Sequence, residues 1–525
     1  MQLPVLELVD LIVRPGGGAL VGGEREQRLQ RRWGQGSGRI GKDEVTSAPQ
    51  LRQVTGAACR IPQALPLLIS VNQEGGRLNA LDWPHVAQMP GHQALGAAGE
   101  SGLAEQVGAA LAGQLRAAGL TWNLAPVCDL ACWPSTPAVG TRALSSDPEL
   151  AARLAAAFVR GLQRAGVAGT AKHFPGLGGV RHDPHLAISA TDRLLPGALV
   201  PFQAAVQAGV ASVMVGSHVV RELEDCPALY SPRTVTGLLR DQLGFDGVIV
   251  SENLSIPAVH AAAGGIAQAA VRAVLAGVDV VMLDSEVSRG QQPTRIWQAG
   301  VRRRAQVVQA LVCAVAQGRI SRARLEASAA RVLRMHARFG LTVDRRQPSW
   351  AEADAVAGAV AERLARQAVT VLRGRELLPL RLGASQALAT VRVPVHGDRR
   401  ADSARHAPDA LPTLLREHHP AVLAQDVGTP PDVAAAGTVV VYGYDTRPGP
   451  GTHASRAAAE VARLKAAGHH VVHVALGDVD DAAGSPADVL IAAYSPHPAS
   501  LRAVAEVLFG HLRAAGALPL AGAEW

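Results

Sequence analysis

The strongest candidates for catalysis or binding lie in residues 172–185, which contain six ionisable side chains. This stretch reads Lys-His-Phe-Pro-Gly-Leu-Gly-Gly-Val-Arg-His-Asp-Pro-His. Its glycines and prolines favour a loop that presents polar groups. The chain has only three lysines, so Lys172 stands out among many arginines. A compact ammonium group suits hydrogen bonds to hydroxyl groups, such as those of a sugar, better than a planar guanidinium does. The alternative is a polar surface turn.

Other polar residues follow short apolar runs that we interpret as buried strands. The expected strands are 66–71, 120–127, 169–173, 211–215, 247–250 and 278–283. The polar groups at their ends are Asn72-Gln73-Glu74, Cys128-Asp129, Lys172-His173, Ser217-His218, Ser251-Glu252-Asn253 and Asp284-Ser285. Several strand ends that carry polar residues are typical of the C-terminal mouth of a barrel, whereas an open sheet would gather them at one switch point.

Ala-rich helical stretches separate these strands. They are 105–118, 150–165, 234–243, 266–276, 302–316 and 322–339. Apolar strands that alternate with helices predict an α/β fold with a parallel sheet covered on both faces. Seven or eight such units favour a (β/α)8 TIM-type barrel over residues 1–345.

A second α/β domain follows this barrel. The pattern predicts a linker helix over residues 346–372 and a C-terminal α/β sandwich domain over residues 373–525. Its expected elements are strands 439–442, 471–476 and 489–493 and a helix over 501–513. Residues 396–436 are rich in Pro, Asp, Arg and His and are expected to be mostly loop.

The charge and cysteine content of the chain bear on which partners and which compartment we expect. The net charge is +7, but the basic residues are scattered among acids, and we interpret the run 302–304 as a solvated helix face rather than a nucleic-acid site. Five cysteines without a paired framework favour reduced thiols in a cytoplasmic protein. We find no signal peptide, membrane span, metal motif or nucleotide motif, so no cofactor is expected. The oligomeric state is open.

At this point the motifs resemble glycoside hydrolase family 3, in particular its β-N-acetylglucosaminidase branch. Residues 69–77 resemble the strand-two signature of that family, and residues 123–129 and 139–142 resemble its strand-three signature and the following loop. Lys172 to Gly176 with Asp183 to His185 resembles the loop that distinguishes this branch. Residues 243–252 resemble the nucleophile segment, and 377–380 and 503–510 resemble parts of the second domain of two-domain members.

The resemblance implies roles for individual residues. His185 would be the general acid/base, with Asp183 as the group that orients it. An imidazole titrates near neutrality, so it can protonate a leaving oxygen and later accept a proton from water. Glu252 would be the nucleophile of a double-displacement mechanism.

Five further residues would bind the substrate: Asn72, Arg142, Lys172, His173 and His218. Arg142 could instead belong to a scaffold ion pair, and His218 could be a satisfied core histidine. Glu74 and Arg77 are expected to be buried framework partners.

Several positions depart from the family pattern. Glu252 replaces the usual Asp, and its side chain is one methylene longer. Asn72 replaces Asp, Asn253 replaces a second acid, Leu177 replaces His and Gly179 replaces Asp.

The leading hypothesis is an exo-acting β-N-acetylhexosaminidase that acts on a small carbohydrate or glycoconjugate. Phosphorolysis is a variant of it, because an imidazole acid repels phosphate less than a carboxylate does. The alternatives are a catalytically impaired sugar-binding or regulatory homologue, and a family member recruited to modify a natural product.

Overall fold

The computed structural model of the chain describes residues 4–14, 37–39, 45–60, 65–83, 85–132, 136, 138–180, 182, 187–283, 293–342, 347–394, 410–427, 436–444 and 455–522. Contacts divide the chain into two compact units. We call residues 1–73, 108–129 and 155–354 the barrel unit, and residues 74–107, 130–154 and 355–525 the sandwich unit. The domain boundaries expected at 345 and 372 stay a prediction.

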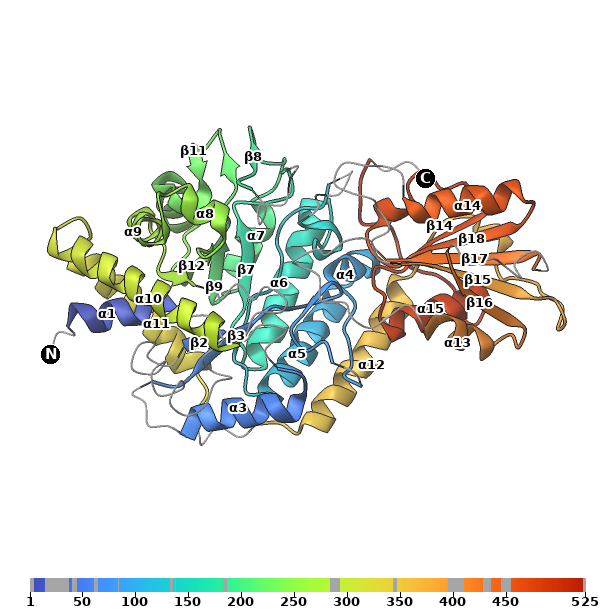
Figure 1. The fold of residues 1–525 in the computed structure, drawn as a ribbon, viewed down its shortest axis with the longest axis horizontal. Coiled ribbons are helices and arrows are strands. Elements are labelled where there is room, and N and C mark those ends of the chain that lie inside the picture. Colours follow the sequence, from blue (N-terminus) through green and yellow to red (C-terminus); the bar gives the residue numbers. More distant parts are fainter. Residues whose placement is uncertain are drawn as a thin grey trace. The chain divides into compact units, whose positions relative to one another are not determined.

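The barrel unit contains eight parallel strands in its described part (Figure 1). They are β1 (Val13–Arg14), β2 (Ser37–Arg39), β3 (Leu68–Val71), β6 (Trp122–Asn123), β7 (Thr170–Phe174), β9 (Ser212–Val215), β12 (Val248–Asn253) and β13 (Val280–Met282). The pairing order is β1-β13-β12-β9-β7 in one sheet and β2-β3-β6 in another. Parallel bridges at Trp122–Ala168 and Val127–Lys172 join the chain at and after β6 to the chain just before and within β7.

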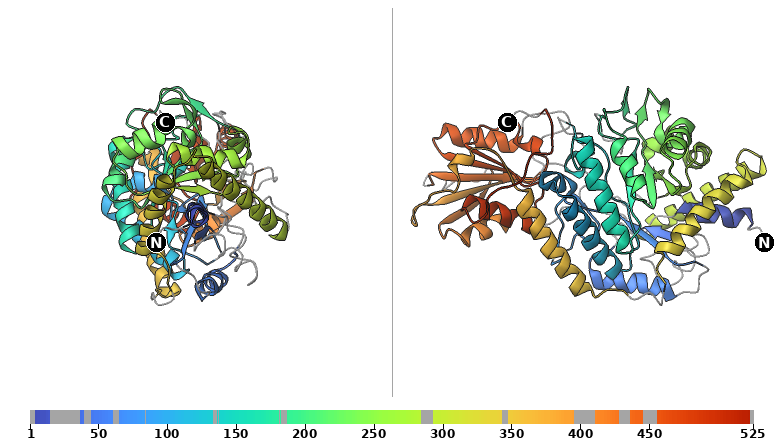
Figure 2. Two further views of the ribbon diagram at one scale, coloured as in Figure 1. Left: turned by 90° about the vertical axis from the view of Figure 1, so that its left-hand side faces the viewer. Right: turned by 180° about the vertical axis from the view of Figure 1, so that it is seen from behind.

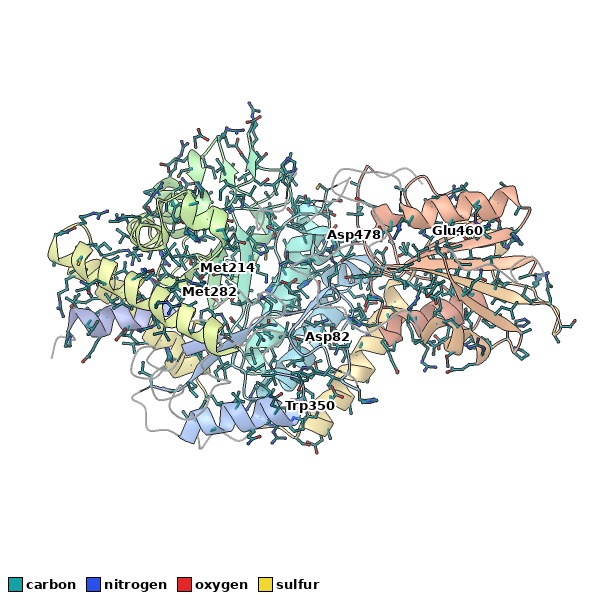
Figure 3. All side chains as sticks on the ribbon, in the orientation of Figure 1. Asp82, Met214, Met282, Trp350, Glu460 and Asp478 are labelled. Carbon is teal, nitrogen blue, oxygen red and sulfur yellow. The ribbon has the colours of Figure 1, made fainter. Side chains whose placement is uncertain are left out.

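The pairing of β1 with β13 brings the first strand beside the last. An open doubly wound sheet does not do this, so the strand order confirms the TIM-type barrel. Side chains from several strands fill its interior, including Leu68, Trp122 and Val250 together with Met214 and Met282, which Figure 3 labels. Because these strands are buried on both faces, they show continuous apolar runs in the sequence.

Four helices of the barrel unit were not among the expected segments: α1 (Val5–Ile12), α3 (Ala48–Arg60), α7 (Val200–Gln207) and α8 (Pro257–Ala261). The π-helix η4 (Arg233–Gln242), α9 (Ile266–Ala276) and α11 (Arg322–Phe339) agree closely with expected helices, and α10 (Pro293–Ala316) begins nine residues before the expected helix over 302–316. Two further helices, α5 (Ser101–Ala117) and α6 (Pro148–Arg164), lie side by side (Figures 1 and 2). They approach closely because Gly108 has no side chain: a Cβ there would lie 2.3 Å from the carbonyl oxygen of Phe158. A small sheet of β8 (Ala190–Thr191), β10 (Val219–Val220) and β11 (Glu224–Pro227) completes the unit.

The structure corrects three expectations. The first two barrel strands, β1 and β2, were not expected, and the segment at 69–77 therefore begins in the third strand rather than the second. Lys172 and His173, which were expected both in strand 169–173 and at the start of the polar loop 172–185, belong to strand β7, so the loop begins later. Arg304 does not lie on a solvated helix face, because it is buried and donates to Asp10 at 2.6 Å.

The sandwich unit is built on a six-stranded sheet in the order β14-β19-β18-β17-β15-β16. Its strands are β14 (Thr370–Arg373), β15 (Leu388–Val393), β16 (Val422–Asp426), β17 (Thr438–Gly443), β18 (His470–Ala475) and β19 (Val489–Ala492). The pair β14–β19 is antiparallel and the other pairs are parallel. The helices of this unit are α4 (His92–Ala98), α12 (Trp350–Ala368), α13 (Ala410–Arg416), α14 (Arg456–Ala466) and α15 (Pro498–Leu508).

Helices cover both faces of this sheet, as expected for an α/β sandwich. Val439 and Val441 of β17 share one core cluster with α14, whereas Val440 and Tyr442 share the other with α13 and α15. This alternation follows from the two-residue period of a strand. Figure 1 shows α14 on one face and α13 and α15 on the other. The expected helix over 501–513 begins earlier and ends at Leu508, and α13 and β16 lie within the segment expected to be mostly loop.

No helix among the described residues is long and apolar enough to cross a membrane.

Candidate functional site

The ends of neighbouring barrel strands bring polar side chains together, and a buried carboxylate is at the centre of one cluster. Asp129 is 1% exposed. Its Oδ2 lies 2.7 Å from Nδ1 of His173, and its Oδ1 accepts from the backbone N–H of His173 at 3.1 Å and of Leu177 at 2.7 Å. Asp129 therefore binds both the end of β7 and the start of the following loop.

Lys172 is 2% exposed and donates from Nζ to Oδ1 of Asn72 at 3.0 Å. Asn123 fixes the backbone of Gln73, the residue after Asn72, through two hydrogen bonds. Its side-chain oxygen accepts from the N–H of Gln73 at 3.0 Å, and its side-chain nitrogen donates to the carbonyl oxygen of Gln73 at 2.8 Å. Two predicted sugar-binding residues thus lie in hydrogen-bond contact on the ends of β3 and β7.

Two pairs of candidate residues lie where the strand register shifts. Along β7, residues 171 and 174 pair with residues 213 and 215 of β9, so β7 has one additional residue there. Along β12, residues 250 and 253 pair with residues 280 and 282 of β13 in the same way. Such bulges change the direction of side chains and are frequent beside active sites. Lys172 and His173 occupy the first shift, and Ser251 and Glu252 occupy the second.

Glu252, the predicted nucleophile, is 6% exposed on β12. Its Oε2 accepts from the backbone N–H of Ser217 at 2.7 Å. Ser251 stabilises the bulge, because its Oγ accepts from the N–H of Met282 at 2.9 Å. The carboxylate is therefore oriented by the strand end next to its own.

His218 is fully buried beside these groups. Burial lowers its pKa to about 4, although the nearby Asp129 and Glu252 carboxylates act in the opposite direction. The ring is consequently neutral near pH 7. It fits because residue 216 is glycine: a Cβ there would lie 2.7 Å from Nδ1 of His218 and 3.4 Å from Cβ of His173.

The charge of Asp129 follows from the same contacts. Burial alone would raise the pKa of Asp129, but the neighbouring His173 and the hydrogen bonds donated by Leu177 and His173 bring it below its usual value. Asp129 is therefore ionised at neutral pH, so it can only accept hydrogen bonds.

The predicted acid/base pair, Asp183 and His185, lies outside the described residues, as do Asp284 and Ser285. Their roles stay predictions from the sequence.

Arg142 lies in the sandwich unit, in the short helix η2 (Gly140–Arg142). It forms a bidentate ion pair with Glu74, with Nε–Oε2 at 2.8 Å and Nη2–Oε1 at 2.9 Å, and donates to the carbonyl of Ala138 at 2.6 Å. Both side chains are buried. Arg142 therefore belongs to a scaffold ion pair, which is the alternative role considered for it from the sequence. The ion pair does not test whether Arg142 also binds sugar, so that role stays a prediction.

A second buried ion pair joins Arg77 to Asp478, at 3.1 Å. Oδ1 of Asp478 also accepts from the N–H of Thr141 at 2.7 Å. Glu74 and Arg77 are therefore framework partners within the sandwich unit.

The sequence analysis did not identify two residues that orient side chains of the cluster, Asp129 and Ser217. Asp129 was noted only as a polar residue after a strand, and Ser217 acts through its backbone. The spacing of Asp129 after an apolar strand could have suggested the first, but no side-chain signal could have revealed the second.

The barrel-unit cluster thus combines two carboxylates, a lysine, two histidines and an amide at one mouth. A carboxylate that is oriented but almost buried can attack a bound electrophile, and the other groups can bind hydroxyls.

Comparison with known proteins points to the same family that the sequence motifs resemble. The model of the glycosyl hydrolase family 3 N terminal domain matches residues 38–335. A β-hexosaminidase of Stenotrophomonas maltophilia is 41% identical over 245 residues, which are 44% of this chain and 72% of that protein. A β-hexosaminidase of Xanthomonas campestris pv. campestris is 36% identical over 251 residues, 46% of this chain and 75% of that protein.

Solved structures extend the likeness to both units. A glycoside hydrolase family 3 β-N-acetylglucosaminidase from Paenibacillus sp. is 29% identical, with a TM-score of 0.85 and 99% coverage of both chains. A β-glucoside phosphorylase has a TM-score of 0.80 at 18% identity, over 99% of this chain and 94% of that one, which shows a shared fold only.

Proposed function

Because the chain belongs to glycosyl hydrolase family 3 and is a glycoside hydrolase that acts on carbohydrate, we propose that it is a retaining exo-β-N-acetylhexosaminidase. It releases terminal N-acetylglucosamine from a glycan or glycoconjugate. The observation that carries this proposal is the buried carboxylate of Glu252 on β12, which accepts from the backbone of the neighbouring strand end at 2.7 Å.

In the proposed mechanism Glu252 attacks the anomeric carbon and the bond to the leaving oxygen breaks. His185, oriented by Asp183, donates its proton to that oxygen. In the second step the neutral imidazole takes a proton from water, the water attacks the anomeric carbon, and the carboxylate of Glu252 leaves. The configuration at the anomeric carbon is therefore retained.

Substrate binding is proposed for Asn72, Lys172, His173, His218 and Arg142. The contact between Lys172 and Asn72 supports part of this set, since it presents an ammonium group and an amide at one strand mouth. The neutral state of His218 supports hydrogen bonding rather than ion pairing to the sugar.

The experiment compares wild type with the variants Glu252→Gln and His185→Ala on aryl and alkyl β-N-acetylglucosaminides. Glu252→Gln removes the nucleophile and is expected to lower kcat by at least about 1,000-fold on both. His185→Ala is expected to lose about 100- to 10,000-fold on the alkyl glycoside and less on the aryl glycoside, whose good leaving group needs less protonation.

Glu352→Gln, on the exposed face of α12, is the matched control and is expected to leave the rates unchanged. Mass spectrometry of the His185→Ala protein during turnover is expected to find the sugar on Glu252. Saturable binding of N-acetylglucosamine without any turnover by wild type would favour the impaired sugar-binding alternative instead.

Product analysis with phosphate present separates hydrolysis from phosphorolysis. A sugar 1-phosphate product would identify the phosphorolytic variant of the mechanism, in which phosphate replaces water in the second step. The cytoplasmic location remains part of the proposal and is supported by the five cysteines, which lie among the described residues and are not in disulfides.

A further inference from the structure

The carboxylate of Asp129 makes three contacts that lead to two functional segments. Oδ2 contacts the ring of His173, and Oδ1 accepts from the backbone N–H of both His173 and Leu177. Leu177 lies in the loop that continues in the sequence to the proposed acid/base pair. The start of this loop is also tied to β7 by the N–H of Gly176, which donates to the carbonyl of His173 at 2.9 Å.

The hydrogen atoms in this cluster can be assigned from the contacts. An ionised carboxylate has no hydrogen to donate, so the 2.7 Å contact with His173 requires a hydrogen on Nδ1. In its neutral form an imidazole carries one hydrogen, so Nε2 is then an acceptor, whereas a protonated ring carries a second hydrogen on Nε2 and donates. Nε2 of the neutral ring can accept a hydrogen bond from a hydroxyl group and cannot donate one.

We propose that Asp129 is a positioning residue that fixes His173 as the Nδ1–H tautomer, so that Nε2 accepts a hydrogen bond from a hydroxyl of the substrate sugar. The inference rests on the proposed function, because it uses His173 as a sugar-binding residue. The same carboxylate accepts from the N–H of Leu177 just after β7, so one buried group serves both sugar recognition and the position of the chain where it leaves this strand.

A purely structural role would leave a different signature. Asp129 is 1% exposed, so any disruption of it could change stability. The proposal makes Nε2 of His173 a hydrogen-bond acceptor. A purely structural role of Asp129 would not require that atom to be an acceptor. The carboxylate of Asp129 can be replaced by an amide of the same shape, which reverses that polarity while an oxygen remains for the two backbone donors.

The variant Asp129→Asn provides this test. Its amide nitrogen would face Nδ1 with hydrogens, so Nδ1 must lose its own hydrogen and Nε2 becomes a donor. We expect kcat/KM on an aryl β-N-acetylglucosaminide to fall about 10- to 100-fold, mainly through KM, since a hydroxyl then meets a donor. Asp129→Ala removes all three acceptor contacts and is expected to lower kcat as well.

His173→Asn supplies the matched background, because its amide nitrogen can still donate to Asp129 while Nε2 is deleted. In that background Asp129→Asn is expected to change KM less than about 3-fold. If Asp129→Asn lowers kcat/KM equally in both backgrounds, Asp129 does not act through His173 and the proposal is wrong.

A second measurement does not depend on turnover or on folding of a variant at residue 129. Two-bond 1H–15N spectra of the protein labelled in its histidines report the tautomer of each ring, and the His173→Asn spectrum identifies the signal of His173. We expect the Nδ1–H form in wild type. The Nε2–H form or the doubly protonated ring there would overturn the proposal, even in a protein that hydrolyses the glycoside, whereas the Nδ1–H form in a protein without activity would refute only the proposed function.

Discussion

We expect the stability of the sandwich unit to fall at acidic pH because this unit contains the buried histidine His473. His473 lies on β18 and is 1% exposed, with Nδ1 2.9 Å from Oγ of Ser485. Burial, with a smaller contribution from Arg373, lowers its pKa from 6.5 to about 4. Below the unfolded pKa the unfolded chain binds a proton that the folded chain does not, so stability falls as the pH falls from about 6.5 to about 4.

The magnitude follows from the same numbers. The shift is about 2.5 pKa units, and each unit corresponds to about 1.4 kcal/mol of stability. Acidification from pH 7.5 to 4.5 spans most of this window, so His473 accounts for a loss of about 2 to 3 kcal/mol in the free energy of unfolding. Carboxyl groups with a lowered pKa, such as Asp488, lose their contribution only below pH 3.8 and therefore act outside the window.

The variant His473→Asn removes this titration. Urea unfolding at several pH values, followed by hydrogen exchange of peptides from β18, measures the stability of the sandwich unit. We expect the difference between the variant and wild type to change by about 2 to 3 kcal/mol from pH 7.5 to 4.5, in favour of the variant. Ser485→Ala is the control, because it removes the hydrogen-bond partner but keeps the titrating ring, so it is expected to lower stability at every pH with the wild-type slope. Parallel pH curves for His473→Asn and wild type would refute the reasoning.

Two further predictions concern packing and charge. Asp478→Asn leaves Arg77 buried beside an amide instead of a carboxylate, so urea unfolding is expected to show a loss of about 3 to 5 kcal/mol in the sandwich unit. Asp192→Asn breaks an exposed pair and is expected to cost less than about 1 kcal/mol; equal losses would contradict the argument from burial. Gly216→Ala places a Cβ 2.7 Å from a ring nitrogen of the buried histidine two residues later, so thermal unfolding and kinetics are expected to show about 1 to 3 kcal/mol of destabilisation and a lower kcat/KM. Gly237→Ala, whose Cβ would meet no atom closer than 3.9 Å, is the control, and an equal effect there would refute the steric reasoning.

The parts of the fold that the sequence predicts are those with long apolar runs or full helical periods. Helices α9 and α11 coincide with the expected segments, and β3 and the later barrel strands lie within or beside the expected runs. The first two barrel strands were missed for a physical reason. β1 has two residues and β2 consists of Ser-Gly-Arg, so neither carries a hydrophobic pattern.

The candidate site was predictable only at the level of residue type. Polar residues after strands correctly pointed to the C-terminal mouth of the barrel, which brings Lys172 into contact with Asn72. The contacts of Asp129 and of the Ser217 N–H with their partners depend on which strand ends are neighbours and on backbone direction. A hydrophobic pattern specifies neither, because it defines which face of a strand is buried and not the local register at its end.

The two register shifts explain how the mouth of the barrel can present consecutive residues. In a regular strand successive side chains point to opposite faces, so only one residue of Lys172–His173, or of Ser251–Glu252, would point in a given direction. The additional residue in β7 and in β12 relaxes this alternation. For Glu252 the consequence concerns its length. Its backbone is held in the bulged strand and its Oε2 accepts from the N–H of Ser217 at 2.7 Å, so side-chain torsions place the longer side chain between two fixed points. The longer side chain therefore still presents an oriented carboxylate, which the role proposed for Glu252 requires.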